Sequence, residues 1–125
     1  MIVALYTGLL GLLLVGLSFY VINWRRKASI GVGFLGSEEL ERAVRAHGNF
    51  TEYVPLALVI IGLYEMSGGA IWSIHALGST LLVARLLHAY GLSRSAGTSA
   101  GRLLGTILTF GVILFGSVML IAPFL

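Results

Sequence analysis

Three long tracts of this chain contain no lysine or arginine, and shorter basic segments separate them. All eight Lys and Arg residues lie within 25–45 or 85–102, so 1–24, 46–84 and 103–125 carry none. Only 10% of the residues are charged, against about 25% in an ordinary globular protein. Long apolar tracts joined by basic connections are typical of proteins that cross a membrane several times. We therefore expect an all-α integral membrane protein.

The pattern predicts four spans, at about 2–23, 38–66, 70–91 and 102–124, in a single domain that covers 1–125. Ser37, followed by acidic residues at 38, 39 and 41, has the character of a helix N-cap with a negative first turn. A linker rich in Gly, Ser and Thr covers 91–101. Short connections make consecutive helices antiparallel, so we expect an up-down-up-down four-helix bundle.

Glycines recur in the first and last predicted spans, at 8, 11 and 16 and at 101, 105, 111 and 116. Small residues let membrane helices approach closely, within a subunit or between subunits. We expect close helix contacts at these positions.

The distribution of charge also predicts orientation. Cations concentrate on cytoplasmic connections, so both basic connections should be cytoplasmic and both termini external. The apolar tract at 2–22 comes before its cations, whereas the cations of a signal peptide come before its apolar tract. We therefore expect a retained first span. The loops are compact and the C-terminal residues match no eukaryotic retention signal, so a bacterial inner membrane is the expected location.

Several function classes are disfavoured. The net charge is only +3 and no polar domain carries it, which argues against a nucleic-acid partner. Cysteine is absent, so there is no disulfide, thiolate metal site or nucleophilic thiol, and we expect no metal.

Residues 31–36 match the dinucleotide fingerprint G-x-G-x-x-G. No strand precedes them, so a nucleotide-binding site is disfavoured there. A proton-coupled transporter needs an embedded carboxylate; the first span has none, and Glu65, near an external helix end, is expected to be solvated.

A polar stripe runs along the second predicted helix. Arg42, Arg45, Asn49 and Glu52 fall at intervals of three, four and three, so they share one helix face. Such a face can be a simple solvated surface, with Arg45 and Glu52 as an ordinary ion pair. It can equally bind a charged ligand at the membrane boundary.

Other ionisable residues should lie level with this stripe. Arg85 and His88 stand three apart near the end of the third span, and Arg102 opens the fourth. The arginines could extend to anionic headgroups, and the histidine could make an interhelical hydrogen bond. Charge inside a span usually points into the bundle at a functional site.

The segment from Glu41 to Pro55, E-R-x-x-R-A-H-x-N-x-x-E-x-x-P, resembles the signature of the MAPEG family, the membrane-associated proteins of eicosanoid and glutathione metabolism. An Ala-Arg-x-x-x-His segment ending at His88, four spans and the chain length extend the resemblance over nearly the whole chain. The family includes glutathione transferases and a member that binds lipid without catalysing.

The resemblance implies a homotrimer that binds glutathione, as co-substrate, between neighbouring subunits near the cytoplasmic face. A lipophilic small-molecule substrate would arrive among the membrane lipids. Arg102 would be the catalytic residue, holding the glutathione thiol as a thiolate. Family enzymes often place a tyrosine where this chain has Leu92, and the nearest phenol is Tyr90. The implied glutathione-binding residues are Arg25 or Arg26, Arg45, His47, Asn49, Glu52, Tyr53, His88 and Tyr90.

These residue types suit the ligand. Glutathione carries two carboxylates and an ammonium, so guanidinium groups and a carboxylate such as Glu52 would bind it. Its thiol, with a free pKa of about 8.5, reacts as thiolate, which a nearby cation stabilises. We expect a glutathione-dependent transferase or peroxidase acting on lipophilic electrophiles or lipid hydroperoxides. The alternative is a non-catalytic lipid-binding or regulatory protein.

Overall fold

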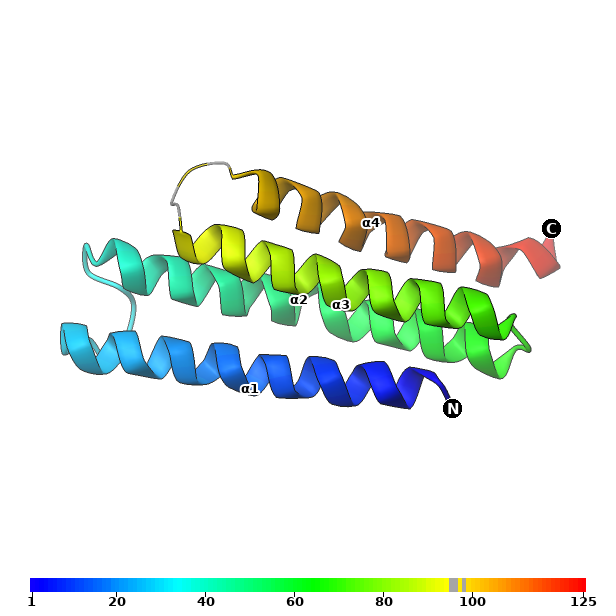
Figure 1. The fold of residues 1–125 in the computed structure, drawn as a ribbon, viewed down its shortest axis with the longest axis horizontal. Coiled ribbons are helices and arrows are strands. Elements are labelled where there is room, and N and C mark those ends of the chain that lie inside the picture. Colours follow the sequence, from blue (N-terminus) through cyan, green and yellow to red (C-terminus); the bar gives the residue numbers. More distant parts are fainter. Residues whose placement is uncertain (95–96, 98) are drawn as a thin grey trace.

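Four antiparallel helices make up the described part of the chain, which in this computed structural model comprises residues 1–94, 97 and 99–125. They are α1 (Val3–Ala28), α2 (Glu38–Met66), α3 (Ile71–Arg94) and α4 (Ala100–Ile121), followed by a short 3-10 turn, η1 (Ala122–Phe124). Both termini lie at one end of the bundle, and the α1–α2 and α3–α4 connections lie at the other (Figure 1). The predicted four-helix bundle is confirmed. Positions 95, 96 and 98 of the predicted linker lie outside the described residues.

The helix ends follow from local chemistry. The Ser37 hydroxyl accepts a hydrogen bond from the backbone N–H of Leu40 at 3.3 Å, so α2 begins as predicted. Helix α1 continues past the predicted end near 23 to Ala28, and its last turn carries three cations. Cations stabilise the negative end of a helix, which accounts for the extra turn. Ser29 then ends α1 in the left-handed conformation.

Two of the helical segments, Val3–Ala28 and Ala100–Phe124, are long and apolar enough to cross a membrane by length and composition alone. The other two helices of the described chain fall short of that measure. Helix α2 is polar in its first half, and α3 carries Arg85 and His88 within its length. Crossing by all four helices therefore stays a prediction.

Helix α4 packs closely against both α3 and α2 at three of its glycines. A Cβ atom on Gly105 would lie 2.5 Å from the carbonyl oxygen of Ala84, and a Cβ on Gly116 2.5 Å from the Ile60 side chain. Gly101 is similarly close to the backbone of α3. The predicted close contacts are thus confirmed at these three positions. A Cβ on glycines 8, 11, 16 or 111 meets no atom within 4 Å, so contacts there, between subunits, stay a prediction.

Hydrogen bonds tie α1 to its neighbours at the end where the termini lie. The backbone N–H groups of Ile2 and Val3 donate to the Glu65 carboxylate, the latter at 2.8 Å. The Tyr6 hydroxyl lies 2.9 Å from Nδ1 of His75. Glu65, which we expected to be simply solvated, therefore serves as a cap for the first turn of α1.

Candidate functional site

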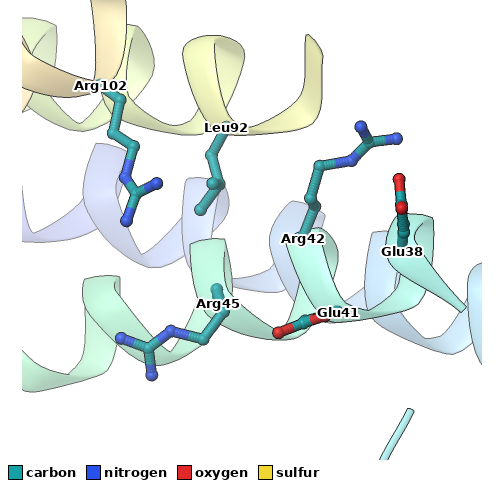
Figure 2. Close-up of a pocket in the computed structure, with 6 residues that line it drawn as sticks. All are labelled: Glu38, Glu41, Arg42, Arg45, Leu92 and Arg102. Atoms are coloured by element: carbon teal, nitrogen blue, oxygen red, sulfur yellow. The ribbon is translucent and has the colours of Figure 1, made fainter. Parts of the chain in front are cut away.

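A pocket of about 320 Å³ opens at the basic end of the bundle. Side chains from three helices line it: Glu38, Glu41, Arg42 and Arg45 from α2, Leu92 from α3 and Arg102 from α4. Figure 2 shows Arg102 and Leu92 extending toward α2, where the guanidinium groups of Arg42 and Arg45 lie on either side. The structure thus brings two of the predicted residues, Arg45 and Arg102, to one pocket.

Local structure explains this arrangement. Arg42 and Arg45 are three residues apart on α2, so both reach the same hollow from adjacent turns. Arg102 lies in the first turn of α4, whose N-cap Ser99 accepts a hydrogen bond from the Arg102 N–H at 3.3 Å. Arg102 also lines a smaller hollow of about 200 Å³ beside Ser99 and Thr106.

The pocket has a mixed but positive lining, with three guanidinium groups and two carboxylates. Within residues 1–94, 97 and 99–125, the one ion pair is between Arg45 and Glu52, at 4.0 Å, and both of those side chains are about half exposed. No carboxylate of the described chain is paired with Arg42 or Arg102. These groups can bind an anionic ligand without first breaking a strong ion pair.

A buried polar layer lies one to two helical turns further along the bundle than the residues that line the pocket. Arg85 is only 1% exposed; its Nη2 donates to Oδ1 of Asn49 at 2.7 Å, and its Nη1 lies 3.5 Å from the Thr109 hydroxyl. His88, 2% exposed, is buried beside it on α3. Arg85 Nε and His88 Nδ1 make no hydrogen bond within the described chain. Asn49 therefore faces the bundle interior rather than the pocket.

Two further predicted residues line a different hollow. Glu52 and Tyr53 face an apolar groove of about 370 Å³ between α2 and α4, which Leu56, Phe110 and Ile113 also line. The Tyr53 and Phe110 rings lie 5.4 Å apart. Because Glu52 also pairs with Arg45, the groove and the pocket are neighbours along α2.

The remaining predicted residues point elsewhere within the single chain. His47 Nε2 lies 3.1 Å from the Ser18 hydroxyl of α1. Arg25 donates to the carbonyl of Gly33 at 2.8 Å, and Arg26 is exposed. Tyr90 is exposed and lies under the guanidinium of Arg94, 4.9 Å from the ring centre.

The predicted binding set omitted residues that the structure places at this end. Arg42 belonged to the polar stripe, and its spacing from Arg45 was the available signal. Glu38 was interpreted only as part of a helix start, and Glu41 also as the first residue of the family signature, but neither as part of a binding site. Arg85 could have been included because an arginine inside a span usually serves a site.

Comparison with known proteins gives one consistent result. The model of the MAPEG family matches residues 3–122. The inner membrane protein YecN of Escherichia coli strain K12 is 43% identical over 91 residues, which are 73% of this chain and 70% of that protein. YecN of Escherichia coli O6:H1 matches to the same extent.

Proposed function

Because this chain belongs to the MAPEG family of membrane proteins, we propose that it is a glutathione-dependent transferase or peroxidase of a bacterial inner membrane. Its second substrate would be a lipophilic electrophile or a lipid hydroperoxide. The name of its relative YecN, an inner membrane protein, supports the location. The observation that carries the proposal is the pocket that Arg42 and Arg45 of α2 and Arg102 of α4 line together.

The lining of this pocket matches glutathione in charge. Arg42 and Arg45 would bind the two carboxylates of the tripeptide, because guanidinium groups pair with carboxylates through two parallel hydrogen bonds. Glu52 would receive the ammonium group, with Glu38 and Glu41 as further acidic neighbours. A volume of about 320 Å³ lies at the lower end of the range for small-molecule sites, and the ligand could extend through the open mouth.

Arg102 is the residue best placed to act on the thiol. A permanent cation beside a thiol favours the thiolate, which is the nucleophilic form. A drop of one pKa unit requires about 1.4 kcal/mol, which one partly buried guanidinium can supply. The thiol proton would leave to water at the pocket mouth. The sulfur would then form a bond to the electrophilic carbon of the second substrate while the leaving group departs with its bonding electron pair. With a hydroperoxide, the sulfur would attack the outer oxygen, so that the O–O bond breaks and the alcohol is released. A second glutathione would then convert the resulting sulfenic acid to the disulfide and water.

The apolar groove between α2 and α4 supports a lipophilic second substrate. Its lining is mainly Leu56, Phe110, Ile113 and the ring of Tyr53, and it adjoins the polar pocket through the Arg45–Glu52 pair. A substrate dissolved among lipid chains would reach such a groove from the bilayer. Its reactive carbon or oxygen would then lie toward the thiolate.

A homotrimer would complete the site. Arg25 or Arg26, His47 and Tyr90 lie away from the pocket of their own chain. In the proposed assembly one of these arginines would reach the glutathione of a neighbouring subunit. His88, buried with Arg85, would support the polar layer beneath the ligand.

The test is the ultraviolet difference absorbance of thiolate when glutathione is added to the purified protein in detergent. We expect a thiolate signal in the wild type that is lost in Arg102→Ala. Arg94→Ala is the matched control, because it removes a cation from the same end of the bundle without touching the pocket. Equal thiolate signals in wild type and Arg102→Ala would overturn the assignment of Arg102.

A non-catalytic, lipid-binding role is the second candidate, and one observation favours it. The pocket wall carries Leu92, the position at which several family enzymes have a tyrosine. Glutathione binding without a thiolate signal, together with no turnover on electrophiles or hydroperoxides, would favour this second function over the first.

A further inference from the structure

We propose that the C-terminal turn of α1 and the loop after it, residues 24–36, form a docking surface for anionic phospholipid headgroups. This surface lies apart from the pocket of its own chain. The inference rests on Trp24, Lys27 and the loop, because Arg25 or Arg26 is already proposed to reach the glutathione of a neighbouring subunit. Its elements are unpaired cations, an aromatic anchor and exposed apolar loop residues, all within one short segment.

The cations of this segment have no acidic partner in the described chain. Arg25, Arg26 and Lys27 occupy the last turn of α1, and the ion pair that the described residues make, Arg45–Glu52, lies elsewhere. Arg25 is turned onto the loop carbonyl of Gly33. Arg26 and Lys27 are exposed. A cluster of unneutralised cations beside a membrane span attracts anionic lipids.

An aromatic anchor lies within the same turn. The Lys27 ammonium lies 4.7 Å from the centre of the Trp24 ring, and Tyr20 meets that ring edge to face at 6.5 Å. Trp and Tyr concentrate at the level of the headgroups, where one part of the ring is apolar and another is hydrated. The indole nitrogen of Trp24 is buried without a hydrogen-bond partner in the described chain. The ring itself is partly exposed beside Lys27, and it is this ring edge that we infer meets the headgroups.

The loop then presents apolar side chains without covering them. Val32 is 88% exposed and Leu35 84% exposed, and Phe34 is partly exposed as well. Gly33 and Gly36 have positive φ values of 69° and 83°, and Leu35 itself is held at 39°. An arginine-to-carbonyl hydrogen bond and the turn between Phe34 and Ser37 hold this form. Exposed apolar residues beside cations fit the boundary between headgroups and acyl chains.

The chain allows a test with an internal control, because it has two tryptophans. Trp24 is in this segment, and Trp72 is 73% exposed at the opposite end of the bundle. In a Trp72→Phe background, fluorescence of Trp24 is measured in vesicles with equal parts of phosphatidylglycerol and phosphatidylcholine. One lipid at a time carries bromine near the headgroup, so quenching reports which lipid contacts the ring.

We expect brominated phosphatidylglycerol to quench Trp24 more strongly than brominated phosphatidylcholine, with the preference falling as salt is added. Lys27→Gln should lower the preference up to about fivefold, the effect of one cation near an anionic surface. Val32→Ser with Leu35→Ser should weaken quenching by both lipids. The Trp24→Phe protein, which reports from Trp72, should show no preference.

Equal quenching of Trp24 by the two lipids, or a preference that survives both Lys27→Gln and Lys27→Glu, would overturn the proposal. So would a Trp24 that neither lipid quenches, since that result would mean another subunit covers the segment. Circular dichroism of each variant confirms that the bundle is folded before quenching is compared.

Discussion

The Arg85 guanidinium donates a hydrogen bond to the Asn49 side-chain oxygen over 2.7 Å, which links α3 to α2 inside the bundle. No carboxylate of the described chain pairs with this buried cation. Its neighbours are the Thr109 hydroxyl and the face of the Phe50 ring, 5.9 Å away. The amide oxygen of Asn49 is therefore its strongest single partner.

Removing that partner should destabilise the protein. We expect Asn49→Ala to lower the free energy of unfolding by about 1 to 3 kcal/mol, because it leaves a buried guanidinium without its acceptor. Denaturant unfolding in mixed micelles measures this. The double variant Asn49→Leu with Arg85→Met should recover much of the loss, since replacing both partners by apolar groups is nearly neutral. Additive losses in the double variant would refute the coupling.

Alanine substitution should have different effects on stability at two glycines of α4. At Gly105 the added methyl would press on the Ala84 carbonyl, so Gly105→Ala should cost about 1 to 3 kcal/mol of stability. At Gly111 the methyl meets no atom of its own subunit, so in a detergent that keeps the protein monomeric Gly111→Ala should be neutral or stabilise by up to about 1 kcal/mol through helix propensity. Thermal unfolding of the pair in one detergent decides the matter. Similar melting temperatures would contradict the close packing.

Glutathione affinity should depend on the arginines of α2. Arg42→Ala and Arg45→Ala should each weaken binding about tenfold, the effect of losing a charge-assisted hydrogen bond of about 1.4 kcal/mol. Isothermal titration calorimetry gives both dissociation constants. Arg94→Ala, whose side chain stacks on Tyr90, should bind as the wild type does. A uniform loss across all three variants would indicate a general effect of net charge.

The groove between α2 and α4 should select the second substrate by size. Ile113→Trp fills part of its volume of about 370 Å³. We expect kcat/KM to fall for long-chain electrophiles and to stay near the wild-type value for small ones, while glutathione affinity is unchanged. A turnover series of increasing chain length checks this. An equal loss for every chain length would place the second substrate elsewhere.

The stabilisation that the Glu65 carboxylate gives to the first turn of α1 can be tested by removing this side chain. Glu65→Ala removes the acceptor for the Ile2 and Val3 N–H groups, and we expect the first turn of α1 to fray. Hydrogen exchange should speed up in the first turn of α1 and stay unchanged near its C-terminal end. Unaltered exchange at residues 2–6 would show that the carboxylate does not cap the helix.

Boundaries set by adjacent residues were predictable from the sequence. The start of α2 was predicted correctly because Ser37 and the acidic residues after it act on their own turn. Helices α1 and α3 continue past the spans predicted at about 2–23 and 70–91, to Ala28 and Arg94, because those spans were drawn from the apolar tract alone. Polar turns such as the one at Arg25 to Ala28 can continue a helix beyond the apolar region.

The candidate site was only partly predictable. Spacing placed Arg45, Asn49 and Glu52 on one face of α2, but it did not say which neighbouring helix each side chain meets. Asn49 turns inward to Arg85, and His47 turns to Ser18 of α1. Which helix a side chain contacts depends on how helices distant in the sequence pack together. Helical periodicity does not contain this information.

The position of Arg85 along α3 leaves this helix a shorter apolar segment than α1 and α4 have. The uncharged part of α3, Ile71–Ala84, is about 21 Å long at 1.5 Å per residue, shorter than a hydrocarbon layer of about 30 Å. Helices α1 and α4 have the full apolar length. Variation in bilayer thickness would then act on α1 and α4 through tilt, while α2 and α3 keep their polar layer at a constant distance from the basic end of the bundle.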